Sequence, residues 1–102
     1  MTDKQIRESL MEQLKAQNNL TDYNESLVND YIRYWNIKEM MVSDIQENGL
    51  RLTIVNGNGF EVVKPNESVQ NLPKITATML KILNDLKLKD PLLATSAEDD
   101  YL

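Results

Sequence analysis

The chain of 102 residues has no cysteine and no histidine. It therefore cannot form disulfides, Cys/His zinc sites, cysteine nucleophiles or a histidine-based catalytic triad. No apolar run approaches the roughly 20 residues that span a membrane, and the first residues lack the apolar region of a signal peptide. These absences favour a soluble intracellular protein without cofactor, bound metal or membrane association. We also find no phosphate-binding loop and no grouping of residues typical of a catalytic site.

The charge of the chain is low overall but unevenly distributed. A net charge of −5 and a pI near 4.6 argue against a strongly basic nucleic-acid binder. Residues 21–49 carry six acids and two bases (−4), and residues 90–102 carry four acids and no base (−4). Residues 50–65 (+1) and 66–89 (+2) together hold a basic excess of +3. A local basic surface of this kind gains strength when an oligomer repeats it.

Apolar spacing and capping signals predict a mainly α-helical domain, residues 1–89, with one central β-hairpin. A first helix over 2–17 begins with a capping box at Thr2 and Gln5. A long helix over 22–48 begins with the same spacing at Asp22 and Glu25, and Gly49 ends it. Together, these signals predict two helices joined by a short turn.

A hairpin and a further helix complete the predicted domain. Two alternating runs flank an Asn/Gly turn at residues 56–59, which predicts a β-hairpin over 50–64. A last helix over 66–87 has Asn66 as its N-cap, and we expect Pro73 to kink or break it near Leu72. Because an isolated two-stranded hairpin is marginal in water, it must pack on a helix or pair with other strands.

The long helix has more apolar surface than one neighbour needs. Two apolar stripes follow a 4-3-4 spacing about 100° apart and cover about half of a helix that is roughly 40 Å long. Either both stripes face one small core, or one of them contacts an adjacent subunit; the length of the helix favours the subunit interface. The residues that we select for packing within or between subunits are Leu27, Tyr31, Tyr34, Trp35, Met41 and Ile45.

The basic excess suggests a phosphate-contacting surface. Lys74 and Lys81 lie on the polar side of the last helix, and further lysines flank its ends. The plainer interpretation is a solvated face, with Lys81 and Asp85 as an ordinary i,i+4 pair. The candidate DNA-binding residues are Lys64, Lys74, Lys81, Lys87 and Lys89.

Other nucleic-acid interpretations fit less well. The first two helices could form a helix-turn-helix, but the second is too long and too acidic for a recognition helix. Tyr31, Tyr34 and Trp35 could stack on bases, although this spacing on a helix favours a core or interface. The acidic tail, residues 90–102, is expected to be disordered or to serve as a short motif for a partner protein.

The order of these elements resembles the small terminase subunits of tailed bacteriophages and prophages, in particular a compact family common in phages of Gram-positive bacteria. The resemblance extends from about Leu10 to Leu88. Two details fit the resemblance less well. Pro73 lies inside the predicted last helix, and Lys87 stands where such sequences often have glycine. The motifs that carry it are Gln13-Leu14, Tyr23, Leu27-Val28-Asn29-Asp30-Tyr31, Trp35, Lys38, Asp44-Ile45, Gly49, the Asn/Gly turn, Lys64, Asn66-Glu67-Ser68-Val69 and Met79-Leu80-Lys81-Ile82-Leu83-Asn84-Asp85-Leu86.

The resemblance implies a non-enzymatic part of a genome-packaging motor in the cytoplasm of the bacterial host. Such subunits assemble into homo-oligomeric rings, engage double-stranded viral DNA and present it to the large subunit, which holds the ATPase and nuclease. The tail, residues 90–102, is free to contact that large subunit. Two alternatives stay open: an adaptor that binds only proteins through its acidic tail, and a small dimeric DNA-binding regulator.

Overall fold

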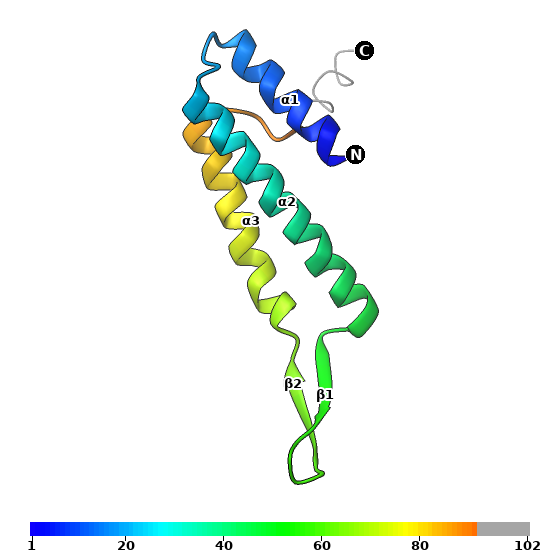
Figure 1. Cartoon of the computed structure of the whole chain (residues 1–102). Helices are drawn as coiled ribbons and strands as arrows, with labels where there is room; N and C mark the ends of the chain where they lie inside the picture. The colour runs from blue at the N-terminus through cyan, green and yellow to red at the C-terminus, as the bar shows by residue number, and fades with distance from the viewer. Residues whose placement is uncertain (92–102) are drawn as a thin grey trace.

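A computed structural model of the chain describes residues 1–91, which form three helices and one hairpin. Helices α2 (Asp22–Asn48) and α3 (Glu67–Leu86) lie side by side along the length of the molecule (Figure 1). Helix α1 (Asp3–Ala16) lies beside the N-terminal part of α2 and runs in the opposite direction. The hairpin of β1 (Arg51–Val55) and β2 (Glu61–Pro65) extends from the other end of the pair. This arrangement confirms the predicted mainly helical fold with one central hairpin.

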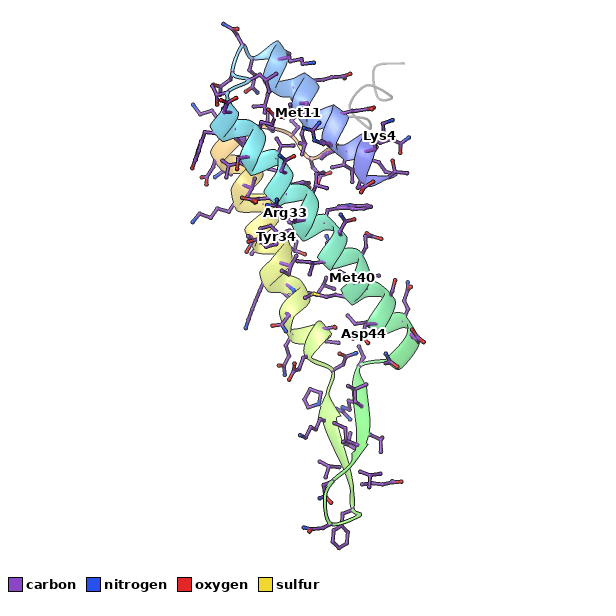
Figure 2. All side chains as sticks on the ribbon, in the orientation of Figure 1. Lys4, Met11, Arg33, Tyr34, Met40 and Asp44 are labelled. Atoms are coloured by element: carbon purple, nitrogen blue, oxygen red, sulfur yellow. The ribbon has the colours of Figure 1, made fainter. Side chains whose placement is uncertain are left out.

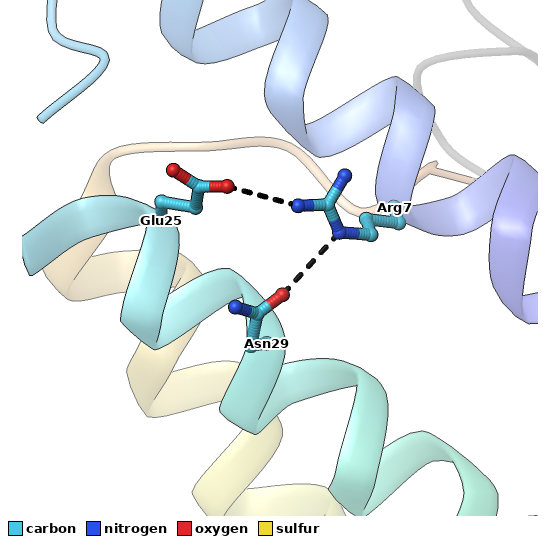
Figure 3. A network of polar contacts seen from close by, with 3 residues as sticks. All are labelled: Arg7, Glu25 and Asn29. Carbon is cyan, nitrogen blue, oxygen red and sulfur yellow. Dashed lines mark hydrogen bonds and ion pairs between the residues drawn. The ribbon is translucent and has the colours of Figure 1, made fainter. Parts of the chain in front are cut away.

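Helix α1 begins as predicted. The Thr2 hydroxyl accepts the Gln5 N–H, and the Gln5 side chain accepts the Thr2 N–H, which completes the capping box. Arg7 holds α1 to α2: its guanidinium donates to Glu25 over 3.0 Å and to Asn29 over 3.3 Å (Figure 3). Because Arg7 and Glu25 are both partly exposed, this ion pair orients α1 more than it stabilises it.

The bounds of α2 are those predicted, 22–48, but the predicted capping residue was wrong by one position. Thr21, and not Asp22, is the N-cap: its hydroxyl accepts the Asn24 N–H over 3.1 Å. Asp22 instead lies in the first turn, where its negative charge suits the positive end of the helix dipole. Gly49 ends α2 as expected, with a φ of 78° that glycine adopts without strain.

Of the kink or break expected near Leu72, the break does not occur. Helix α3 runs without interruption from Glu67 to Leu86 with Pro73 inside it, and Asn66 is its N-cap as predicted. Pro73 lies on the exposed side of α3, so water can bind the carbonyl group of Val69 that loses its helical partner. Leu72 and Ile75 flank the proline on the half-buried side, which keeps both parts of the helix packed on α2.

The buried core lies only at the end of the molecule that α1 covers. It combines residues of all three helices and the segment after α3, and it excludes the hairpin. Within residues 1–91, no helix is long and apolar enough to cross a membrane. The buried core residues are Ile6, Leu10, Leu14, Val28, Tyr31, Met79, Ile82, Leu83, Leu86 and Leu88.

The hairpin is antiparallel and starts and ends one residue later than predicted. Ile54 pairs with Val62, and Arg51 pairs with Pro65. Asn56 stabilises the turn, since its side-chain oxygen accepts the N–H groups of Asn58 and Phe60. Both strands contact chiefly each other. Among residues 1–91, the helices therefore do not supply the partner that we expected the hairpin to need.

Candidate functional site

The five candidate lysines are all exposed. Lys64 lies on β2, Lys74 and Lys81 on the outer side of α3, and Lys87 and Lys89 in the segment after α3. Two ion pairs are seen within residues 1–91, Arg7–Glu25 and Arg33–Asp30, and neither of them includes one of the five lysines. The i,i+4 ion pair between Lys81 and Asp85 that the plainer interpretation required is absent from the described residues.

These lysines are spread over α3 and the segments at its two ends. Seven residues separate Lys74 from Lys81, which places both on one side of the helix about 10 Å apart along its axis. Lys64 lies beyond the N-terminal end of α3, and Lys87 and Lys89 lie beyond its C-terminal end. A set of separated positive charges is suited to an extended polyanion and less suited to one small anion.

Two glutamines hold the segment after α3: Gln13 of α1 and Gln17, which is the C-cap of α1. The side chain of Gln13 accepts the Lys89 N–H over 2.8 Å and donates to the Lys89 carbonyl over 3.1 Å. Gln17 donates to the carbonyl of Lys87 over 2.9 Å. These bonds fix the backbone and leave both lysine side chains in solvent. The sequence analysis missed this role, although the i,i+4 spacing of the two glutamines was a signal that both amides share one face.

Lys87 has an unusual backbone conformation. Its φ of 56° lies in the left-handed region, which glycine adopts freely and lysine does not. It ends α3 through two hydrogen bonds, from Lys87 N–H to the Asn84 carbonyl and from Leu88 N–H to the Leu83 carbonyl. The departure from the family pattern noted in the sequence therefore coincides with a strained residue.

A polar network joins the hairpin to the two long helices. Asp44, near the end of α2, accepts hydrogen bonds of 2.6 Å from the Ser68 hydroxyl and from the Asn48 amide. These bonds and one from Asn66 lower the pKa of Asp44, because they stabilise the carboxylate. The buried Asn66 side chain donates to the Gly49 carbonyl and accepts the Ser68 N–H. The network fixes where the hairpin leaves the helices. The sequence predicted only the Asn66 cap of this network and none of its other hydrogen bonds.

The hairpin exposes apolar side chains on both of its faces. Phe60 at the turn is 68% exposed and Val63 is 62% exposed, and Leu50, Ile54 and Val55 are exposed as well. Figure 2 shows that the side chains of the hairpin project on either side of its ribbon. The outer edges of β1 and β2 also have no strand beside them within residues 1–91. Exposed apolar faces and open edges are features of a surface that pairs with another chain.

The predicted packing residues of α2 fall into two groups. Tyr31 is buried in the core, so it cannot stack on a base while the fold is intact, and Leu27, Tyr34 and Trp35 pack partly buried against that core. Met41 and Ile45 are half-buried beyond the core, on the part of α2 that α1 does not cover.

The acidic residues do not gather into a metal site. Among residues 1–91, no group of three or more carboxylate side chains is placed to hold a metal ion. Asp30 instead pairs with Arg33 over 2.8 Å, and Asp44 belongs to the network at the hairpin. The tail from residue 92 onward, to which the sequence analysis assigned a partner-binding motif, lies outside the described residues.

Comparison with known proteins gives one match. A family model described as phage terminase, small subunit, matches residues 4–90. Searches of curated proteins and of solved structures found no match. The matched residues include α1, the long helix pair, the hairpin and all five candidate lysines.

Proposed function

Because the chain belongs to the phage terminase small-subunit family, we propose that it engages viral double-stranded DNA as an oligomeric ring and regulates the large terminase subunit. The family match supports a role in phage genome packaging. The observation that carries the finer proposal is the set of five exposed lysines, two on α3 and three beyond its ends, together with helix and hairpin surfaces that the described chain leaves uncovered. We treat residues 1–89 as one domain and residues 90–102 as its tail.

The uncovered end of the helix pair is the proposed subunit interface. Helix α1 has 14 residues and α2 has 27, so α1 shields about 20 of the 40 Å of α2. Beyond it, Met41, Val42 and Ile45 remain half-buried on α2. A neighbouring subunit that covers these residues would complete the burial. If the contact is head-to-tail and its rotation closes, the product is a ring.

The hairpin supports the same assembly. In a ring, β1 of one subunit and β2 of the next would pair edge to edge, which saturates their backbone hydrogen bonds. The apolar side chains of both hairpin faces would then have neighbours from other copies. In this proposal, the neighbouring subunits of the oligomer supply the partner that an isolated hairpin needs.

DNA engagement is assigned to Lys64, Lys74, Lys81, Lys87 and Lys89. Two or three phosphate contacts in one subunit give weak binding with a strong dependence on salt, and a ring multiplies them. The acidic surface of α2 would repel DNA and thus favour contact through α3. The protein itself is proposed to be non-enzymatic, to act in the cytoplasm of the bacterial host and to contact the large subunit through its tail.

DNA binding is tested by a mobility-shift titration with double-stranded DNA at several salt concentrations. We expect Lys74→Gln with Lys81→Gln to weaken binding and to lower the salt slope by about 1 for each phosphate that a lysine no longer neutralises. The matched control, Lys4→Gln with Lys15→Gln, removes the same charge from exposed positions of α1. Equal weakening in both variants would contradict the assignment, and no salt-dependent binding by the unaltered protein would favour the adaptor.

Assembly is tested by native mass spectrometry at moderate salt. We expect one closed species of many subunits. A monomer at tens of micromolar would contradict the ring, and a stable dimer that binds DNA would favour a small regulator. Ile45→Asp, at a half-buried position outside the core, is expected to dissociate the ring while the helical circular dichroism spectrum is retained.

A further inference from the structure

Residues 87–91 form a strap that leads from the end of α3 back along α1. Gln17 donates to the Lys87 carbonyl over 2.9 Å. Gln13 pairs with both backbone groups of Lys89: its side-chain oxygen accepts the N–H over 2.8 Å, and its amide donates to the carbonyl over 3.1 Å. Because the later glutamine holds the earlier lysine, the strap runs antiparallel to α1.

The spacing of the two glutamines matches the strap. Four residues of a helix rise about 6 Å, so Gln13 and Gln17 lie one turn apart on one face. Two residues of chain span at most about 7 Å. The glutamines are therefore spaced to hold alternate residues of the strap, Lys87 and Lys89.

These contacts fix the strap in one register. Leu88 is 8% exposed and belongs to the core, whereas Lys87 and Lys89 on either side of it are exposed. A shift of the strap by one residue would bring a lysine into the core and Leu88 into solvent, as in a strand that slips. Gln13 opposes this shift because both of its hydrogen bonds go to the same residue.

The far end of the strap is anchored on the core. Pro91 is buried, and Asp90 and Pro91 border the same small cavity as Ile6 of α1 and Tyr31 of α2. Burial and the negative charge of Asp90 raise the pKa of Tyr31 to about 12. The two lysines therefore lie on a segment that is fixed by α3 at one end and by the core at the other.

We propose that Gln13 and Gln17 are positioning residues for DNA binding, which hold the strap so that Lys87 and Lys89 face solvent in a fixed place at the end of α3. This inference rests on the proposed function, since it needs these lysines to contact phosphate. Groups that are held in place before binding lose less conformational freedom on binding. Helix α1, which carries none of the five candidate lysines, thereby regulates the affinity for DNA.

The strap itself is tested without DNA, by amide hydrogen exchange. Gln13→Ala removes the acceptor of the Lys89 N–H, and we expect this N–H to exchange about 2- to 10-fold faster. Gln70→Ala, at an exposed position of α3, removes the same side chain and is the matched control. A retained helical circular dichroism spectrum shows that the variant is folded. Equal exchange of Lys89 in the two variants would overturn the proposal.

Binding is tested by mobility-shift titrations of duplex DNA with Gln13→Ala, with a Lys87→Gln, Lys89→Gln variant, and with the combination of all three changes. We expect Gln13→Ala to raise the Kd about 2- to 10-fold, and to have no effect once both lysines are replaced. A merely structural role of Gln13 would weaken binding by the same factor in both backgrounds, which would overturn the proposal.

The outcomes separate this inference from the proposed function. If the unaltered chain binds no DNA, both are wrong. If it binds DNA and Gln13→Ala has the same Kd as Gln70→Ala, only the inference is wrong. The inference alone also fails if replacing Lys87 and Lys89 leaves the Kd unchanged.

Discussion

The two ends of the α2–α3 pair are built differently. At the end that α1 covers, ten apolar residues are buried and three helices meet. At the hairpin end, the one buried residue within residues 1–91 is the polar Asn66, and hydrogen bonds take the place of a core. At one end the two helices are therefore part of a buried core. At the other end hydrogen bonds fix their direction, but no apolar core surrounds them.

This difference between the two ends suggests that one end stabilises the subunit and the other is available to a partner. A segment with few buried apolar contacts opens at low free energy, whereas a core element opens only with the whole domain. Apolar surface that is exposed but held in a fixed direction is available to a partner without first unfolding anything. The α1 end is thus expected to set the stability of the subunit, and the hairpin end to report on assembly.

The largest effect is expected from a core truncation at the α1 end. Leu10 is fully buried, at 0% exposure, so Leu10→Ala should lower the free energy of unfolding by about 2–5 kcal/mol through reduced burial and a residual cavity. Urea denaturation followed by circular dichroism measures the decrease.

The matched change at the hairpin end is Val63→Ala. In the isolated subunit, Val63 is 62% exposed, and the decrease should stay within about 0.5 kcal/mol. If Val63→Ala costs as much as Leu10→Ala, and the cost depends on protein concentration, the hairpin is buried in the assembly. A similar cost that is independent of concentration would contradict the comparison.

A decrease between those of Leu10→Ala and Val63→Ala is expected from Asn66→Ala at the junction. Asn66 is 2% exposed, caps α3 through the Ser68 N–H and donates to the Gly49 carbonyl over 2.9 Å. Removing a cap and a buried partner should lower the free energy of unfolding by about 1–2 kcal/mol. Asn66→Ser keeps a capping oxygen and should be less destabilised. Equal effects in the two variants would mean that the bond to Gly49, and not the cap, supports the junction.

Much of the fold could be predicted because its signals are local. The capping box at Thr2, the Asn66 cap, Gly49 and the Asn/Gly turn each place a boundary within one or two residues. The error at Asp22 arose because Thr21 offers an equivalent oxygen one residue earlier. The expected break at Pro73 neglected that an exposed proline leaves its unpaired carbonyl in contact with water.

What escaped prediction depends on residues that are distant in sequence. Asp44 meets Ser68 across 24 residues, and Gln13 meets Lys89 across 76. Neither pair has a periodicity that sequence alone can reveal. The exposed state of the five lysines could be expected from helix spacing, but the left-handed conformation of Lys87 could not.

Lys87→Gly is expected to stabilise the α1 end slightly. Glycine relieves the left-handed strain of about 1–2 kcal/mol but loses about 0.4–1 kcal/mol in unfolded-state entropy, so a gain of about 0.5–1 kcal/mol remains. If Lys87 contacts DNA, the same variant binds more weakly although it is more stable. Asn18→Gly, at a φ of 53°, should gain less because asparagine tolerates this conformation. If Lys87→Gly is less stable than the unaltered chain, the left-handed conformation of Lys87 is not strained.

The last effect concerns the charge of Asp44, and its dependence on pH is seen only in acid. The hydrogen bonds from Ser68, Asn48 and Asn66 lower the pKa of Asp44 below its usual 3.8. The folded state therefore binds this proton less readily than the unfolded state. The contribution of Asp44 is fully present above about pH 4 and is lost as the pH falls through the lowered pKa.

Asp44→Asn removes this titration and leaves the rest of the junction in place. The difference in unfolding free energy between the unaltered chain and Asp44→Asn should be constant at neutral pH and shrink below about pH 4. Denaturant titrations between pH 7 and pH 2 measure it. A difference that does not change with pH would show that the network does not depend on the charge of Asp44. The hairpin would then be oriented by the Asn66 cap alone.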